Sequence, residues 1–140
     1  LLVTNGSGWA MKLSEDLGGH TISNNILLND NINTGSISVP NINFTSNNNA
    51  LVGRLSFDGE ISIVNLDAWQ AAGFDANSFT TTSSSLFVNT ATNNYRLKAG
   101  APGIDTGLGS MNDIAAPATD ILGNARPQGS AHDLGAYESN

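Results

Sequence analysis

The sequence predicts an all-β fold in which short strands stack as the coils of a solenoid. Charged residues make up 12% of the 140 residues and aromatic residues 6%, which leaves few large side chains for a compact core. Short runs that alternate apolar with polar residues are separated by Gly, Pro and Asn, as in strands joined by turns. Stacked coils suit this composition, because each turn needs only a thin row of inward apolar side chains.

The expected coils occupy residues 1–100, and most of their strands lie in the first half of the chain. Alternation begins at residues 9–13 and stops at Gly18 and Gly19. Other runs rich in β-branched residues follow at residues 21–28, 36–39, 41–44 and 60–64. We expect parallel strands spaced at about 4.8 Å over residues 8–64. Eight side chains are expected to share one continuous interior: Ile22, Ile26, Leu28, Ile42, Phe44, Leu51, Ile61 and Ile63.

An Asn-rich pattern repeats at the interval expected of stacked coils. Residues 23–26 read Ser-Asn-Asn-Ile, and a similar Ser-Asn-Asn run starts at Ser46, about 23 residues later. Asn tolerates left-handed backbone angles, and its amide can bond the same residue in the next coil. The alternative is that polar loops simply accumulate Asn, but the apolar residues after each Asn pair fall in phase. The pattern therefore favours a ladder of Asn side chains at equivalent turns.

One short helix is expected near residues 66–72. Asn65 is a suitable N-cap, Asp67 places an acid in the first turn, and Gly73 can end the helix. Residues 101–140 are expected to form an irregular tail that packs on the last coils within the same domain.

The charge balance argues against nucleic acid as a partner. The chain has 5 Lys and Arg against 12 Asp and Glu, a net charge of −7, so it lacks the basic cluster that a phosphate backbone requires. It contains no apolar run of about 18 residues, the length that spans a membrane. We therefore expect no nucleic acid and no membrane span. The composition suits an extracellular or cell-surface solenoid.

Three tail segments carry a family resemblance. Residues 97–107 read Leu-Lys-Ala-Gly-Ala-Pro-Gly-Ile-Asp-Thr-Gly, residues 120–127 read Asp-Ile-Leu-Gly-Asn-Ala-Arg-Pro, and residues 132–138 read His-Asp-Leu-Gly-Ala-Tyr-Glu. These segments resemble the C-terminal end of secreted bacterial right-handed parallel β-helix proteins. The resemblance implies that fold for this chain, with a final coil directly before the tail.

The resemblance covers residues 65–138, with two departures. Ser84 and Ser85 stand where these proteins often have Asp-Pro, which removes a turn-forming Pro. Ala101 and Gly103 flank a Pro where Ser-Pro-Ala is commoner, so small residues for close packing are retained. The Asn-rich first half shares only the general coil character.

The tail gathers acidic side chains around one cation. One interpretation is structural: Arg126 forks to a carboxylate, and the tail is held along the last coil by burial of Ile104, Ile121, Leu134 and Tyr137. The alternative is a calcium site, because hard cations take several carboxylate oxygens. We prefer the structural interpretation, although the acids are too scattered along the sequence to decide between the two. The candidate partners of Arg126 are Asp105, Asp120, Asp133 and Glu138.

A second calcium-like pattern lies at residues 29–35, where oxygen-bearing side chains alternate along the chain. An EF-hand loop needs a bidentate Glu at its twelfth position, and Pro40 stands there. We interpret the segment as a solvated turn. No cofactor is expected, and calcium is the one candidate that the sequence leaves open.

Gly19 and His20 faintly resemble the Gly-His-Gly element of polygalacturonase-type β-helix hydrolases. Asp16 and Asp30 flank His20, but spacing cannot show whether two carboxyl groups face each other at the roughly 6.5–9.5 Å of an inverting pair. The Arg-x-Lys element of those enzymes is missing. A surface hydrogen-bonding role is the preferred interpretation, and no catalytic residue is expected.

Trp9 and Trp69 are the candidate ligand-binding residues, because aromatic faces suit the apolar face of a sugar ring. Each has a structural alternative. Trp9 lies in an expected strand and Trp69 in the expected helix, where both would contribute to packing.

Two classes of function fit the sequence. The first is a non-enzymatic extracellular β-solenoid module, structural, adhesive or self-assembling, with weak glycan binding as an added property. The second is the C-terminal fragment of a carbohydrate-active β-helix enzyme, a polysaccharide lyase or glycoside hydrolase, whose catalytic coils lie upstream. We favour the first, because the sequence contains no adequate catalytic set.

Leu1, Leu2 and Val3 open the chain without Met or a basic signal region, which suggests a processed precursor or a piece of a longer solenoid. Strand edges in the first coil would then pair with another copy of the chain or with upstream coils. Head-to-tail stacking would give a filament if the rotation does not close. A polysaccharide is the remaining candidate partner.

Overall fold

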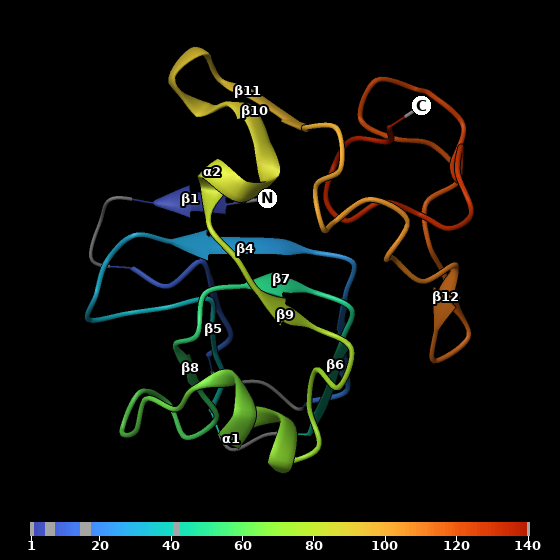
Figure 1. The fold of residues 1–140 in the computed structure, drawn as a ribbon. Helices are drawn as coiled ribbons and strands as arrows, with labels where there is room; N and C mark the ends of the chain where they lie inside the picture. Colours follow the sequence, from blue (N-terminus) through green and yellow to red (C-terminus); the bar gives the residue numbers. More distant parts are fainter. Residues whose placement is uncertain (1, 5–7, 15–17, 41–42, 140) are drawn as a thin grey trace.

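The computed structural model describes residues 2–4, 8–14, 18–40 and 43–139. Short strands dominate it, and helical turns are few, which confirms the all-β class. Figure 1 shows the strands of the first half stacked in layers, with the C-terminal tail to one side.

Nine strands pair in parallel in three sheets of the described chain. Sheet 1 has the order β1 (Leu2–Thr4), β4 (Ile26–Asn29), β7 (Ala50–Leu51) and β9 (Phe79–Thr80). Sheet 2 has the order β2 (Met11–Lys12), β5 (Ile37–Ser38) and β8 (Leu55–Ser56). Sheet 3 consists of β3 (His20–Ser23) and β6 (Phe44–Asn47).

The chain visits sheets 1, 2 and 3 in turn and then returns to sheet 1. Parallel strands cannot be joined by a tight hairpin, so each return needs a long connection, which the other two sheets supply. His20 aligns with Phe44, and Ile26 aligns with Ala50, a separation of 24 residues in both cases. The Asn-rich repeat therefore marks one full turn of the chain.

The expected Asn ladder is confirmed at the turn between sheets 3 and 1. Asn24 and Asn48 both have left-handed backbone angles, with φ of 59° and 52°. The backbone N–H and the side-chain amide of Asn25 both donate to Oδ1 of Asn49, at 2.9 and 3.2 Å. Asn49 is fully buried, and these bonds satisfy its carbonyl oxygen.

The interior is divided between two clusters, so the expectation of one continuous interior is wrong. Leu27 on β4 points into the inner cluster, whereas Ile26 and Leu28 belong to an outer cluster on the opposite face. Alternate residues of a strand face opposite sides, and here both sides are covered. The inner cluster also holds Ile22, Ile37, Val39, Phe44, Leu51, Leu55, Leu66 and Trp69. The outer cluster also holds Ala50, Leu86, Phe87, Leu97, Ala101 and Leu134.

Two of the expected core residues, Ile61 and Ile63, lie at the surface instead, with exposed fractions of 86% and 47%. Leu55 pairs with Val64 in an antiparallel bridge, so the residues between them fold back as a loop. Within this loop Asp58 accepts the N–H of Ser62 at 3.0 Å. A third expected core residue, Ile42, lies outside the described residues.

The helix α1 spans Leu66–Ala71 and ends at Ala72, close to the expected range. Oδ1 of Asn65 accepts the N–H of Ala68 at 2.9 Å, as an N-cap does. Trp69 on this helix is completely buried against the aromatic rings of Phe44, Phe57 and Phe74. In Figure 1 α1 lies at the opposite end of the stack from β1.

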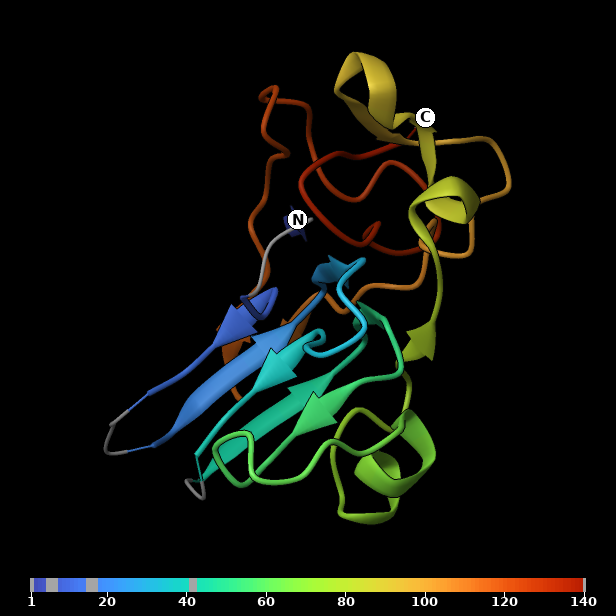
Figure 2. The ribbon, with the colours of Figure 1, turned by 90° about the vertical axis from the view of Figure 1, so that its left-hand side faces the viewer.

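Parallel pairing continues beyond the expected residues 8–64, and β9 is the last described strand that pairs in parallel. After it the chain forms a helical turn, α2 (Ser83–Leu86), and an antiparallel hairpin of β10 (Phe87–Asn89) and β11 (Asn94–Leu97) around the 3-10 turn η1 (Thr90–Thr92). Figure 2 shows this hairpin above the stack, beside the tail.

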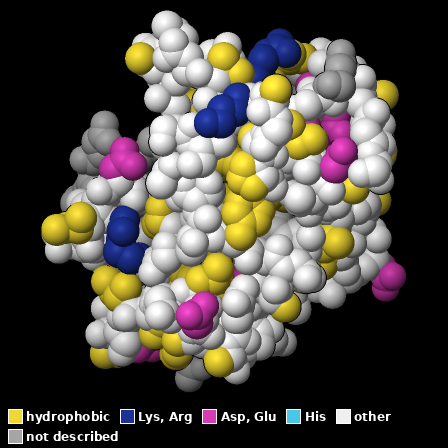
Figure 3. All heavy atoms as spheres, in the orientation of Figure 1, with side chains coloured by type: hydrophobic (Ala, Val, Ile, Leu, Met, Phe, Trp, Pro, Cys, Tyr) yellow, Lys and Arg dark blue, Asp and Glu magenta, His cyan; other side chains and the backbone are white. Residues whose placement is uncertain are grey.

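Residues 101–139 consist mainly of turns, with one short hairpin of β12 (Ser110–Met111) and β13 (Ile114–Ala115). Ala101 and Leu134 cover the outer face of β4 and β7. Gly135 lies so close to the Ile26 side chain that a Cβ would be 2.8 Å from it. The tail therefore forms an outer layer on sheet 1. Figure 3, in the orientation of Figure 1, shows that few charged side chains lie on this face of the molecule.

Candidate functional site

The candidate site is the end of the stack formed by the first turn, called here the open end. Each strand of this turn has a described partner on one side only: β1 pairs with β4, β2 with β5, and β3 with β6. The backbone N–H groups of Met11 and Leu13 donate to carbonyls of the second turn. Because strand residues alternate, the N–H of Lys12 points to the side of β2 that has no described partner strand.

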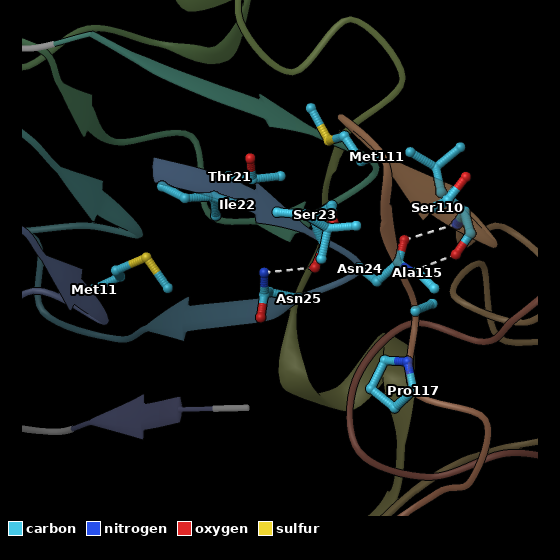
Figure 4. A pocket seen from close by; sticks show the side chains of 13 residues that line it. Met11, Thr21, Ile22, Ser23, Asn24, Asn25, Ser110, Met111, Ala115 and Pro117 are labelled. Atoms are coloured by element: carbon cyan, nitrogen blue, oxygen red, sulfur yellow. Dashed lines mark hydrogen bonds between the residues drawn. The ribbon is translucent and has the colours of Figure 1, made fainter. Parts of the chain in front are cut away.

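A groove of about 310 Å³ lies at this end, between the first turn and the β12–β13 hairpin. Its walls include Met11, Ile22, Met111, Ile114 and Ala115, together with polar residues around Asn24. Figure 4 shows Met11 on the coil side of the groove and Ala115 and Pro117 on the tail side. Ile114 is 61% exposed, so the tail adds an apolar surface next to the strand edges.

Side chains of the Asn ladder hold the tail beside this groove. Asn24 donates to the carbonyl of Leu108 and accepts its N–H, both at 2.7 Å. Asn48, one turn further along, donates to the carbonyl of Thr106 at 2.8 Å. Hydrogen bonds from these Asn side chains to backbone groups of the tail therefore fix the groove wall to the strands.

Thr21 and Thr45, which are neighbours across sheet 3, provide a further attachment point. The Asn112 side chain donates to both hydroxyls, at 3.1 and 2.7 Å. Asn112 lies in the β12–β13 turn with a left-handed φ of 51°. The hairpin is thereby pinned across two successive coils.

The two tryptophans considered as sugar platforms are both in the interior of the structure. Trp9 is 8% exposed. Trp69 is completely buried, and its indole N–H donates to Oδ2 of Asp75 at 2.8 Å. In this structure Trp69 presents no ring face to a ligand, and its position is that of a core residue.

Arg126 lies against one of its four candidate acids. Its Nε is 2.7 Å from Oε2 of Glu138, and the two side chains are 6% and 0% exposed. Arg126 also donates to the carbonyl of Asp133. The second carboxylate oxygen of Glu138 accepts the N–H of Gln128 at 3.1 Å. The pair thus ties three segments of the tail together.

The other three acids are held by amide donors. Oδ1 of Asp133 accepts the N–H of Asp105 at 2.8 Å, and Asp105 accepts the N–H of Ala131 at 3.0 Å. Burial raises the pKa of Asp120, but bonds from the side chain and backbone of Asn124 and from the N–H groups of Glu138 and Leu122 outweigh it, and they lower the pKa to about 2. These acids act as acceptors for turn backbone.

An arginine occupies the calcium-like loop at residues 29–35. Nη2 of Arg54 donates to the carbonyls of Asn29 and Asn31, both at 2.7 Å, and Nε donates to Thr34. Asn29 and Asn31 each accept a backbone N–H two residues further on. Positive charge for the loop carbonyls therefore comes from a guanidinium. No group of three or more His, Cys, Asp or Glu positioned for a metal ion occurs among the described residues.

His20 is the first residue of β3 and aligns with Phe44 in the next turn. Asp30, the candidate acid on the C-terminal side of His20, is exposed in the loop after β4. Asp16 lies outside the described residues. The structure brings no pair of carboxyl groups to His20 within the described part of the chain.

Sequence reasoning missed a second groove, which lies in the tail. It has a volume of about 560 Å³, and its lining includes Arg96, Tyr137, Leu122 and Gln128. The guanidinium carbon of Arg96 lies 5.6 Å from the centre of the Tyr137 ring. Tyr137 is half-buried and Ile121 is 66% exposed, so the expected burial of Ile121 is wrong and that of Tyr137 is incomplete. Arg96 and Gln128 lie far apart in the sequence, so no local motif could have revealed the groove.

Comparisons of the chain with protein-family models, with curated proteins and with solved structures found no match.

Among the helices of the described residues, none is long and apolar enough to cross a membrane.

Proposed function

We propose that the chain is a non-enzymatic end module of an extracellular right-handed parallel β-helix, with a structural or adhesive role at a cell surface. The observation that carries the proposal is the contrast between the two ends of the stack. Among the described residues, β1, β2 and β3 of the first turn each pair on one side only, whereas at the other end the edges of β6 and β8 are bonded to Asp75 and Val64, and β9 is the strand left with a single partner. Such a module would terminate a coil and leave one end for further coils.

Strand order supports a helical coil. A chain that passes through three parallel sheets in the same order, turn after turn, describes a spiral around a common interior. The inner cluster provides that interior, since it draws Ile22, Ile37 and Leu51 from all three sheets. Right-handedness follows from the general preference for right-handed connections between parallel strands.

The tail supports an extracellular location through its resemblance to secreted β-helix proteins. The residues that carry this resemblance also hold the tail in place. Arg126 and Glu138 form a buried ion pair, and Asp105 and Asp133 bind turn backbone.

Further coils are the partner that the open end fits, either in another copy of the chain or upstream in the same precursor. If two copies associate through their open ends, the covered ends point outward, so association stops at a closed dimer. Head-to-tail stacking into a filament would instead need an uncovered last turn. The enzyme alternative uses the same open end, continued by catalytic coils.

Lys12→Pro tests the open end. Proline removes the N–H that points away from β5, so it should block pairing with a second chain while the bonds from Met11 and Leu13 remain. We expect the unmodified chain to dimerise with increasing concentration in analytical ultracentrifugation and Lys12→Pro to stay monomeric. Lys12→Ala is the matched control, because it removes the same side chain but keeps the N–H.

Equal association of the Pro and Ala variants would show that β2 is not the contact. An unmodified chain that stays monomeric at every concentration would contradict self-association and favour the enzyme or precursor alternative, in which upstream coils complete the stack.

A further inference from the structure

The guanidinium of Arg96 is an unpaired cation at the rim of the tail groove. Arg96 is exposed on β11, and its guanidinium forms no ion pair with a carboxylate of the described residues. Its described protein contact is the Tyr137 ring, 5.6 Å from the guanidinium carbon. An arginine that rests on an aromatic ring keeps its planar fork of N–H donors free for a ligand.

The groove next to Arg96 combines apolar and amide surfaces. Leu122, 52% exposed, and Ile104, half-buried, supply apolar walls. The side-chain amide of Gln128 makes no hydrogen bond to a described residue, and Asn124 uses its amide nitrogen on Asp120, which leaves its carbonyl oxygen available. At about 560 Å³ the groove is large enough for a small ligand.

Acids near the groove are already neutralised or occupied. Glu138 pairs with Arg126, and both are buried. Asp120 accepts N–H groups from Leu122, Asn124 and Glu138. Asp120 stays ionised with its oxygens occupied, and Arg96 is the cation among the described residues that line the groove, in a chain with a net charge of −7. A carboxylate can bind here in spite of the repulsion expected for a long polyanion.

We propose that this groove binds a sugar residue that carries a carboxylate, such as a uronic acid at the end of a glycan. Arg96 takes the carboxylate through two parallel N–H bonds. The apolar face of the sugar ring packs on Leu122 and the edge of Tyr137, while the amides of Gln128 and Asn124 meet its hydroxyls. Neither Trp9 nor Trp69 lines this groove, and it shares no lining residue with the groove at the open end.

The test is a titration with a short oligogalacturonate, followed by NMR shifts of the backbone amides, with a galactose oligosaccharide of equal length in parallel. We expect the acidic sugar to shift residues around Arg96, Gln128 and Tyr137, and the neutral one to bind much more weakly. Arg96→Ala should weaken binding by roughly ten- to a hundredfold, the value of a charge-assisted bond pair.

Lys98→Ala is the matched control. Lys98 lies just after β11 and carries the same charge, but its Nζ contacts the carbonyl of Ser84 and it does not line the groove. Its loss should change binding by less than about twofold. Equal losses in the two variants, equal binding of the acidic and neutral sugars, or no binding would each overturn the proposal.

This proposal and the end-module proposal fail separately. Lys12→Pro alters the open end and should leave sugar binding unchanged. Arg96→Ala should leave the association state unchanged and lower the melting temperature only slightly, because the one contact that its exposed side chain loses is that with the Tyr137 ring.

Discussion

The two ends of the strand stack differ in whether another segment of the chain is hydrogen-bonded to their strand edges. At the open end β2 and β3 each pair on one side only in the described structure. At the other end the carbonyl of Ser46 on β6 accepts the N–H of Asp75 at 2.7 Å, and Leu55 on β8 exchanges two hydrogen bonds with Val64. Unpaired edges invite association, so the cover at one end gives the stack a direction.

The covered end also contains the largest side chains of the inner cluster. The rings of Phe44 and Phe74 stack with centroids 4.2 Å apart, and Trp69 is in contact with both. Met11, by contrast, is only half-buried at the open end and lines the groove there. Aromatic residues are scarce in this chain, and a connected group of four of them, Phe44, Phe57, Trp69 and Phe74, packs at the covered end.

Trp69→Ala should have the largest effect. Removing a completely buried indole leaves a cavity and should lower the free energy of unfolding by about 4 kcal/mol. It should also loosen α1 and make the covered end prone to association. Urea unfolding measures the first effect and analytical ultracentrifugation the second.

Trp69→Phe is the control for this variant. It keeps an aromatic ring in the cluster but removes the N–H that Asp75 accepts, so it should cost about 2 kcal/mol. Asp75 keeps donors from Asn49 and Ser78. A loss as large as that of Trp69→Ala would mean that the hydrogen bond, rather than packing, closes this end.

Arg126→Ala should have the next largest effect. It leaves the buried carboxylate of Glu138 without its cation and should cost about 3 kcal/mol, visible as a lower melting temperature. The tail covers the outer face of sheet 1 and not the end of the stack, so this variant should not acquire the association expected of Trp69→Ala.

Lys12→Ala provides the comparison for a surface ion pair. Lys12 and Glu60 also form an ion pair, but their side chains are 54% and 34% exposed. Its loss should cost less than about 1 kcal/mol. If Arg126→Ala also left the melting temperature unchanged, the buried ion pair between Arg126 and Glu138 would not be what holds the tail.

The sequence predicted the features that repeat or that have local signals. Asn24 and Asn48 were recognised because left-handed turns favour Asn and because the pattern recurs. The helix was recognised because Asn65 and Gly73 are local start and stop signals. The helix signals are close together in the sequence, and the Asn pattern repeats at a fixed interval. Both can be recognised from the sequence without tertiary structure.

Features that depend on the outer layer could not be predicted in this way. Ile26 and Ile22 look alike in the sequence, yet they belong to different clusters. The cluster of Ile26 includes residues of the β10–β11 hairpin and Leu134 of the tail, which is more than a hundred residues away in the sequence. The groove at Arg96 and Tyr137 likewise forms only where tail and hairpin meet. Alternation predicts that a side chain is covered, but not what covers it.

Ile61→Ser should have the smallest effect and tests the limit of the alternating pattern. Residues 60–64 alternate as a buried strand would, but Ile61 is 86% exposed in the loop between Leu55 and Val64. Replacing an exposed side chain should change the free energy of unfolding by no more than about 0.5 kcal/mol. Leu55→Ser is the contrast, because Leu55 is completely buried on β8 and its loss should cost several-fold more in the same urea experiment. If Ile61→Ser were as damaging as Leu55→Ser, the loop would have to lie inside the covered end, and the difference between the two ends would need another explanation.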